Sequence, residues 1–397
     1  MRKKIVILTA FLFSAGLCLA ACPSADLTGD CFVDFNDFAI LAANWPATDY
    51  NDLALLAAEW LAPDPRVPDD MTYIPGGTFE MGDNLGDGSS DELPVHTVTV
   101  NSFYMAKYEI TNGQYCDYLN SAQSQGLIIV IDGVVYQSGT GTTYPYCDTS
   151  VADTESQIAY GGGVFSVQSK GRRSMGNDPL VQVSWFGAVA YCNWRSWLEG
   201  LKPCYNLSTW DCDFAQKGYH VPTEAQWELA ARGGLSGKRF PWGDTISHSQ
   251  ANYHSSTNYG YDVSLTRGYH PTWNDGIYPY TSPVDSLAAN GYGLHDMAGN
   301  LYEWCNDWYS SSYYSSSPSN NPTGPPSGVS RILRGGSWNH DANRSRVAER
   351  YGLTPATRGY GHGLRIALDS SVIDTNPTDI DNVAKDADAG KHRLISN

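Results

Sequence analysis

Basic residues are scarce in this chain of 397 residues. Lysine and arginine together number 25 against 42 aspartates and glutamates, which leaves a formal net charge of −17 at pH 7. A basic patch strong enough to hold nucleic acid or an anionic membrane surface is therefore not expected. The chain also lacks an internal apolar run long enough to cross a bilayer. Membrane attachment is expected only through a lipid anchor near the N-terminus.

Regular secondary structure is also predicted to be sparse. The chain contains 39 glycines, and aromatic residues make up 12 % of it, which favours an aromatic core inside a loop-rich backbone. A helix is still predicted to begin near Gly113, and capping residues predict two more, which begin at Trp185 and after Thr223. Alternating apolar residues predict strands at 78–81 and 96–101. The Gly-, Ser- and Thr-rich residues 121–177 are interpreted as an insertion with short strands.

The first 21 residues have the pattern of a secretory signal segment. Residues 2–4 are basic and residues 5–17 are apolar. Residues 19–22 resemble a bacterial lipobox, in which Cys22 would carry the lipid, and the alternative is ordinary cleavage near Ala21. Both alternatives predict an extracytoplasmic protein, secreted or lipid-anchored at the cell envelope, where disulfides are permitted.

Residues 22–61 resemble a degenerate dockerin-like helical module. Six residues fall at liganding positions of a calcium loop: Asp26, Thr28, Asp30, Phe32 (through its carbonyl), Asp34 and Asp37. The helical segment 36–45 recurs at 51–60, but the second copy lacks an acidic loop, and Cys31 replaces the turn glycine of the first. A calcium-dependent pair that docks to a cohesin-like partner and a vestigial helical spacer both remain open. The proline-rich residues 62–70 form a linker.

The stretch from Asn290 to Trp304 reads NGYGLHDMAGNLYEW. Each of its glycines would cost a helix about 1 kcal/mol relative to alanine, and they are too frequent for an ordinary strand. We therefore expect a tightly wound irregular segment that buries Leu294 and Trp304 and brings the carboxylates of Asp296 and Glu303 together. Carboxylates beside backbone carbonyls are what calcium binds, and the alternative is a buried loop whose acids accept hydrogen bonds.

The same stretch closely resembles the core signature of the sulfatase-modifying-factor family, the formylglycine-generating enzyme group. Further motifs follow in family order, from MTYIPGGTFEMGD at 71–83 to GHGLRIAL at 361–368. Between these two lie the matching segments 91–119, 178–194, 218–234, 240–244 and 332–338. The resemblance implies an α+β fold: an irregular, C-type-lectin-like domain over 71–369 with little regular secondary structure, preceded by the small helical pair. Residues 370–397 are polar, lack aromatics and are expected to be a disordered tail.

The resemblance also identifies where copper would bind. Active members of the family hold Cu(I) between two cysteine thiolates shortly after a GGSW-type motif, and aligning on that motif places His340 and Ser345 at the two positions. No cysteine follows Cys305, and a serine hydroxyl cannot replace a soft thiolate for Cu(I). Copper and formylglycine-forming activity are therefore not expected.

Another metal is a weaker hypothesis. His340, Asp341 and His362 lie near the C-terminal end of the domain and can converge. A histidine beside an aspartate is more often a hydrogen-bonded surface pair, which we take as the simpler interpretation.

Two calcium sites of the family have counterparts in the sequence. The first ligand set that the resemblance implies is the side chains of Asn252 and Asp275 with the carbonyls of Tyr253 and Ile277. The second is the side chains of Asp296 and Glu303 with the carbonyls of Gly299 and Leu301. The family usually has asparagine where Asp296 stands. Both are all-oxygen sets, which suit calcium, and we expect the ions to tie irregular segments together.

The nine cysteines offer two disulfide candidates. Cys204 and Cys212 bracket a short polar loop that a disulfide can close, and by elimination Cys116 can pair with Cys147. Connectivity does not follow from sequence alone, so both pairings remain predictions.

Three classes of function remain. The first is a calcium-stabilised extracytoplasmic binding module that lacks the copper pair and holds a peptide or glycan in the family cleft, near Trp338, His340 and Arg344. The second is an oxidase that converts a sulfatase cysteine to formylglycine, or a divergent metal-dependent relative. The third is a docking component that acts through residues 22–61. The missing thiolates favour the first class, although the fold alone does not decide function.

Overall fold

The computed structural model describes residues 67–150, 155–171 and 173–372. The chain divides into two units, Met1–Pro68 and Asp69–Asn397, and the description below concerns the second. The lipidation candidate Cys22 and the predicted loop ligands lie outside the described residues, as does the tail after Val372. The loop ligands are Asp26, Thr28, Asp30, Phe32, Asp34 and Asp37.

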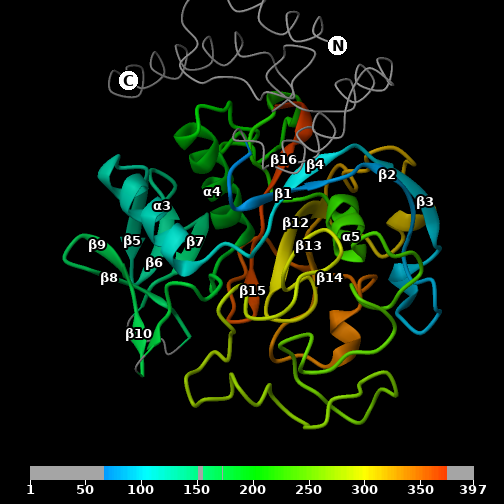
Figure 1. Ribbon diagram of the computed structural model, residues 1–397. Helices are drawn as coiled ribbons and strands as arrows, with labels where there is room; N and C mark the ends of the chain where they lie inside the picture. The colour runs from blue at the N-terminus through cyan, green and yellow to red at the C-terminus, as the bar shows by residue number, and fades with distance from the viewer. Residues whose placement is uncertain (1–66, 151–154, 172, 373–397) are drawn as a thin grey trace, which may run out of the picture. The chain divides into compact units, whose positions relative to one another are not determined.

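Two small sheets form the middle of the domain (Figure 1). The larger has four strands in the order β14 (Tyr351–Leu353), β13 (Arg331–Arg334), β12 (Tyr302–Trp308) and β15 (His362–Gly363). β12 pairs antiparallel with β13 and parallel with β15. In the smaller sheet β4 (Phe103–Ala106) lies between β1 (Met71–Ile74) and β16 (Ala367–Asp369). One strand therefore joins the beginning and the end of the domain.

Three α-helices occur among the described residues, and all three were predicted. They are α3 (Asn112–Ser124), α4 (Trp185–Leu198) and α5 (Glu224–Arg232). Each begins after a hydroxyl cap, since the side chains of Thr111, Ser184 and Thr223 accept a hydrogen bond from a backbone N–H three residues later. α5 ends at Gly233, whose φ of +55° is the left-handed conformation that glycine adopts without strain. α5 lies beside β12 and β13 (Figure 1).

The remaining strands form hairpins and one small sheet. β2 (Gly77–Met81) pairs with β3 (His96–Val100). β5 (Ile128–Ile131), β6 (Val134–Gln137) and β7 (Pro145–Asp148) form a three-stranded sheet. Two hairpins follow: β8 (Ile158–Gly161) with β9 (Val164–Val167), and β10 (Ser169–Lys170) with β11 (Arg173–Ser174). β5 to β11 occupy the interpreted insertion and lie on the side of α3 (Figure 1). Short 3-10 helices cover Ser90–Glu92, Phe214–Gln216, Tyr313–Ser315, Ala342–Ser345 and Ser370–Val372.

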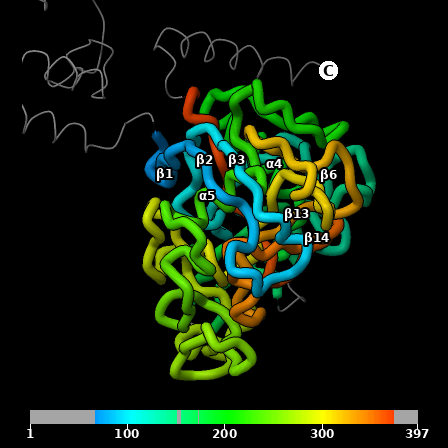
Figure 2. Tube along the Cα trace, turned by 90° about the vertical axis from the view of Figure 1, so that its right-hand side faces the viewer, coloured from blue at the N-terminus to red at the C-terminus, as the bar shows by residue number. Residues whose placement is uncertain are grey.

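A long irregular segment connects α5 to β12. Residues 234–301 contain no helix or strand in the structure and form the looped region at the bottom of Figures 1 and 2. The prediction of an irregular segment from Asn290 is correct as far as Leu301, and the burial of Leu294 and Trp304 is confirmed. It is wrong from Tyr302 onward, where β12 begins. The glycines that argued against a strand end at Gly299, so nothing opposes extended pairing after it.

The α+β fold with little regular secondary structure is thus confirmed. Its main core joins α5 to both sheets through residues such as Phe103, Trp227 and Ile332. No helix in the described ranges has both the length and the apolar character that crossing a membrane requires.

Candidate functional site

Glu303 on β12 is the centre of a buried cluster of acids. Its carboxylate accepts a hydrogen bond from Arg365 at 2.8 Å and one from the Trp227 indole at 2.7 Å. All three side chains are essentially inaccessible to solvent. The sequence predicted Glu303 as an acidic partner of Asp296, and the structure shows in addition that an arginine already neutralises it.

Glu109 joins this cluster from the segment before α3. It is 1 % exposed, and its carboxylate accepts hydrogen bonds from the Asn300 side chain at 2.8 Å and the Leu301 backbone N–H at 3.0 Å. Burial raises the pKa of Glu109 well above its ordinary value, and the neighbouring Asp296 and Glu303 raise it further. Three carboxylates in the cluster therefore share the positive charge of Arg365.

Asp296 is the member of the cluster without a partner. Its side chain is 8 % exposed, and neither carboxylate oxygen has a hydrogen-bond partner within the described part of the chain. Burial raises its pKa to about 7 even though Arg365 acts in the opposite direction. An unpaired buried carboxylate is costly, so this position favours a proton or a bound cation.

These acids fit the second predicted calcium set in part. Asp296 offers two free hard oxygens, which suit calcium, whereas the Glu303 oxygens are already occupied by Arg365 and Trp227. Across the described ranges, no group of three or more His, Cys, Asp or Glu side chains is arranged to hold a metal ion. Calcium would need carbonyl or water oxygens as well, and the contributions of Gly299 and Leu301 remain predictions.

The first predicted calcium set is spread over separate contacts. The Asn252 side chain is buried and donates to the Tyr280 carbonyl at 2.9 Å, and the Tyr253 carbonyl lies 3.2 Å from the His248 ring. Asp275 is exposed and accepts a hydrogen bond from the Ile277 backbone at 2.9 Å. This set also remains a prediction.

The two positions of the family's thiolates lie around the 3-10 helix Ala342–Ser345. His340 Nδ1 is 2.7 Å from the Ser337 hydroxyl, and Ser345 is completely buried with no partner for its hydroxyl in the described residues. Burial lowers the pKa of His340, and the neighbouring Arg344 lowers it further. An imidazole and a buried hydroxyl therefore occupy the two positions at which the family resemblance predicts thiolates.

His362 on β15 lies beside His340. Burial and the neighbouring His340 lower the pKa of His362 to about 4, so both rings are neutral at neutral pH. The Tyr302 ring lies 5.2 Å from the His340 ring and 6.4 Å from that of His362. Asp341 does not join them, because its carboxylate lies 3.3 Å from the His254 ring.

Arg344 and Trp338, which the sequence predicted to line the family cleft, differ in exposure. The Arg344 side chain is 40 % exposed and pairs with Glu349 at 2.5 Å. Burial raises the pKa of Glu349 to about 7 despite that pairing. Trp338 is 1 % exposed and packs in a core cluster with Val181 and Leu301, so its side chain does not reach a ligand. The half-buried tyrosines around it are Tyr269, Tyr278, Tyr280 and Tyr360.

The cysteines are free thiols throughout the described ranges. A hydrogen bond between the Cys204 and Cys212 thiols lowers the pKa of Cys204 to about 5. Burial, followed by the same hydrogen bond, raises the pKa of Cys212. Cys116 and Cys147 are both buried and close enough to influence each other's charge. The two disulfide pairings remain predictions.

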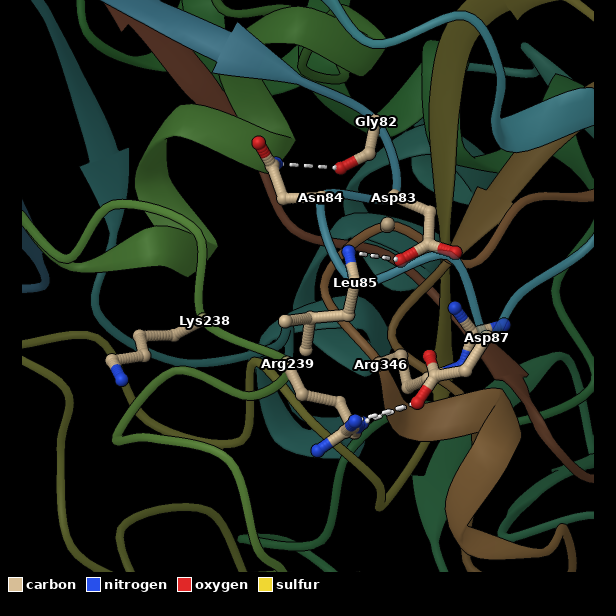
Figure 3. Close-up of a pocket in the computed structure, with 9 residues that line it drawn as sticks. Gly82, Asp83, Asn84, Leu85, Asp87, Lys238, Arg239 and Arg346 are labelled. Atoms are coloured by element: carbon tan, nitrogen blue, oxygen red, sulfur yellow. Dashed lines mark hydrogen bonds and ion pairs between the residues drawn. The ribbon is translucent and has the colours of Figure 1, made fainter.

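A small charged pocket lies at the turn after β2 (Figure 3). It is lined by Asp83, Asp87, Lys238 and Arg239, but its volume of about 10 Å³ leaves room for little more than a water molecule. Arg239 pairs with Asp87, as Figure 3 shows, and Lys238 with Asp244. Because Arg239 and Lys238 are already paired with Asp87 and Asp244, we assign this pocket a structural role.

Comparisons with known proteins identify the family of this chain. A model of the sulfatase-modifying factor enzyme 1-like domain matches residues 57–370, and the chain belongs to this family. The formylglycine-generating enzyme of Streptomyces coelicolor is 33 % identical over 328 residues, which cover 78 % of this chain and 92 % of the relative. The inactive C-alpha-formylglycine-generating enzyme 2 of Bos taurus is 29 % identical over 312 residues, or 75 % and 87 % of the two chains.

Solved structures share the fold. PvdO from Pseudomonas aeruginosa has a TM-score of 0.50 and 25 % identity, over 78 % of this chain and all of PvdO. The Treponema denticola variable protein 1 has a TM-score of 0.51 and 24 % identity, over 75 % of this chain and 94 % of that protein. These likenesses establish the architecture of the domain.

Sequence reasoning missed residues of the acid cluster around Glu303 and residues close to His340. Glu109 and Arg365 lie in stretches that carried the family resemblance, but no spacing links them to Asp296, more than 60 residues from either. Glu349 and Tyr302 were missed too, although Glu349 lies only five residues after Arg344 and Tyr302 lies within the stretch from Asn290 to Trp304. His362 was identified, but only as a possible metal ligand.

Proposed function

We propose that this domain is a calcium-stabilised binding module that has lost the copper chemistry of its family. The observation that carries the proposal is the replacement of both thiolates, by His340 with its Nδ1 engaged by Ser337 and by the buried hydroxyl of Ser345. Neither group is the soft anionic ligand that Cu(I) prefers. The family includes proteins named as generating enzymes and one named inactive, so it accommodates both kinds of member.

The cleft surface supports binding of a peptide or a glycan. Half-buried tyrosines surround Trp338 and combine flat apolar rings with hydroxyl groups, which serve both kinds of ligand. The partly exposed Arg344 adds a donor that Glu349 holds in place. The proposal also includes an extracytoplasmic location, by secretion or by a lipid on Cys22. It further includes docking to a partner through residues 22–61.

The oxidase alternative is tested directly. The full chain is incubated with Cu(I), oxygen and a peptide that carries a sulfatase-type cysteine, beside an active relative, and the peptide is weighed by mass spectrometry. We expect an unchanged peptide mass with this protein and a loss that matches thiol-to-aldehyde conversion with the relative. The same loss with this protein would overturn the proposal.

A matched pair of variants tests the ligand argument. The double substitution His340→Cys with Ser345→Cys restores two thiolates, so Cu(I) affinity is expected to rise by at least tenfold over wild type, as soft ligands require. The single substitution Ser345→Cys supplies one thiolate and serves as the control. Equal copper affinity of wild type and double variant, measured by competition with a Cu(I) chelator, would contradict the assignment of the two positions.

A further inference from the structure

Arg358 differs from the other arginines in the described part of the chain. Ten of these twelve arginines form an ion pair with an aspartate or a glutamate. Arg331 has no such pair, but its guanidinium lies over the rings of Trp185 and Trp308 and donates to the Asn306 carbonyl. The Arg358 side chain forms no hydrogen bond or ion pair with another described residue, and its Nε is buried.

An unpaired arginine is unexpected in this protein. The formal net charge is −17, so carboxylates are plentiful, and a guanidinium keeps its charge at neutral pH. Arg358 is only partly exposed, which removes part of the water that would otherwise solvate its charge. Such a group gains free energy when an anion from outside the domain pairs with it.

The backbone around Arg358 belongs to the cleft described above. The carbonyl of the next residue, Gly359, accepts a hydrogen bond from the His362 N–H at 3.2 Å, and a Cβ added to Gly359 would lie 2.9 Å from the His362 ring. One residue further, the Tyr360 carbonyl accepts a hydrogen bond from the Trp338 indole at 3.0 Å. Arg358 therefore lies at the edge of the cleft, beside the segment that joins its histidines to its tyrosines.

Two acids close to this segment limit which anion fits. Gln182 donates its N–H to the Gly359 carbonyl at 3.0 Å, its Nε2 donates to Glu155 at 2.7 Å, and its carbonyl accepts from the Asp148 N–H at 3.1 Å. Neither acid forms an ion pair with Arg358 among the residues that the structure describes. Their charges oppose a second negative charge, so a carboxylate suits the site better than a doubly charged phosphate.

The tyrosines of the cleft favour a peptide over a sugar. The Tyr278 ring meets Trp338 at 87° and Tyr280 at 78°, and Tyr280 meets Tyr269 at 62°. These edge-to-face contacts cover ring faces that a sugar would need for stacking, whereas a peptide can use ring edges and hydroxyls. The Lys170 ammonium, which donates to the Tyr278 carbonyl at 3.1 Å, adds a positive charge near these rings.

We propose that Arg358 binds the carboxylate of an aspartate or glutamate side chain in a peptide held by the cleft. The guanidinium is a planar fork of donors that matches the two oxygens of a carboxylate. The inference rests on the binding function proposed above and specifies its ligand as an acidic peptide.

A peptide library tests the proposal. The full chain is immobilised and incubated with acetylated, amidated hexapeptides that carry aspartate, glutamate, asparagine or glutamine at one position and mixed neutral residues elsewhere. Because both chain ends are blocked, the acidic side chain is the only charge, and mass spectrometry counts the bound peptides. We expect the acidic peptides to be enriched about three- to tenfold over their amide counterparts, as one charge-assisted contact at a partly exposed site allows.

Three variants assign the preference to Arg358. Arg358→Gln is expected to abolish it and to leave the binding of neutral peptides unchanged, and it removes no internal contact on which folding depends. Arg358→Lys keeps the charge without the fork and should retain part of the preference. Lys238→Gln removes the same charge from an exposed ion pair with Asp244 and is the matched control, so it should keep the wild-type ratio. Circular dichroism confirms that each variant is folded.

The failure of this inference differs from the failure of the proposed function. Equal binding of acidic and neutral peptides would keep the binding function and overturn the role of Arg358. Absence of any bound peptide would overturn both. Equal loss of the preference in Arg358→Gln and Lys238→Gln would assign it to the overall charge of the chain and contradict the proposal. Tighter binding of phosphoserine peptides, or of a uronic-acid oligosaccharide, would contradict it as well.

Discussion

The domain buries two clusters of charge that differ in their balance. Beside α5, Glu224 accepts hydrogen bonds from Arg350 at 2.7 and 2.9 Å, and Glu228 pairs with Arg232 at 2.6 Å and with Arg334. All five side chains are at most 4 % exposed. In the other cluster, Arg365 is the arginine that faces Asp296, Glu109 and Glu303.

The difference shows which cluster is electrostatically neutralised by its own arginines. Buried carboxylates that are paired and hydrogen-bonded stay ionised without help, whereas removing one partner leaves a buried charge that is strongly destabilising. The cluster beside α5 carries its own counter-ions. The cluster at Asp296 does not, so its stability depends on what the solution supplies, either protons or a cation.

Breaking the balanced cluster is expected to have the largest effect. Arg334 also donates to the carbonyls of Val347 at 2.9 Å, Ala348 at 2.8 Å and Glu349. Arg334→Met leaves these three carbonyls without this donor and removes one of the two arginines that pair with Glu228. We expect a loss of about 3–5 kcal/mol in the free energy of unfolding. Urea denaturation followed by tryptophan fluorescence measures it.

A solvent-exposed ion pair provides the control for that substitution. Lys238 and Asp244 lie 2.7 Å apart with side chains 44 % and 45 % exposed. Lys238→Met is expected to change stability by less than about 1 kcal/mol, because water and salt screen the pair. Similar losses in the two variants would show that burial does not set the importance of the Arg334 contacts.

His362 is also largely buried, and its Nδ1 has no hydrogen-bond partner in the described residues. Burial keeps its ring neutral by favouring loss of a proton, whereas burial favours gain of a proton at Asp296. Its pKa is lowered from 6.5 to about 4, so between these pH values the unfolded chain binds a proton that the folded chain does not. Stability from this group is complete above pH 6.5 and falls by up to about 3 kcal/mol as the pH decreases to 4. Unfolding curves across this pH range measure the slope.

The variant that isolates this contribution is His362→Gln, which does not titrate. It is expected to flatten the acid limb of the stability profile relative to wild type. An unaltered slope in His362→Gln would mean that other groups cause the acid sensitivity.

Of the two buried charge clusters, only the acid-rich one around Asp296 is expected to be stabilised by calcium. At a free concentration about 100 times its dissociation constant, an ion that binds only the folded state adds about 2.7 kcal/mol to the free energy of unfolding. Asp296→Gly removes the unpaired carboxylate and suits the backbone there, whose φ is +57°. The increment between chelator and calcium is expected to shrink in that variant.

Two further variants sharpen the calcium result. Arg334→Met lies in the balanced cluster and should keep the wild-type calcium increment. Asp275→Ala reports the first predicted ligand set separately, since Asp275 is exposed and distant in sequence from the acid cluster. A full increment in Asp296→Gly would exclude the second set and leave the first as the explanation.

Local chemistry explains what the sequence could predict. Ser184 and Thr223 were predicted as caps because a hydroxyl beside the first turn satisfies a backbone N–H, a rule that needs no tertiary information. Thr111, which was not predicted as a cap, follows the same rule. The burial of Trp304 and the proximity of Asp296 to Glu303 also follow from one short stretch. Where glycines stop after Gly299, the same local rule had predicted coil and β12 formed, because the partner strands β13 and β15 are distant in sequence.

Long-range pairings explain what the sequence could not predict. Arg365 meets Glu303 across 62 positions, and Glu109 meets Asn300 across 191. No periodicity or motif links such residues, so the counter-ion of one acid and the lack of one for Asp296 emerge only from the fold. A cavity beside α4 is likewise lined by residues of α3, α4 and the sheet β5–β7, which are far apart in the sequence.

The sheet that contains β4 has a consequence for how this domain forms. β4 pairs with β1 on one edge and with β16 on the other, so its last hydrogen bonds come from residues 367–369. A chain that leaves the ribosome N-terminus first cannot complete that sheet until nearly the whole domain has been synthesised. Assembly must therefore follow translation, and contacts between distant segments, which slow folding, must form before the edges of β4 are covered.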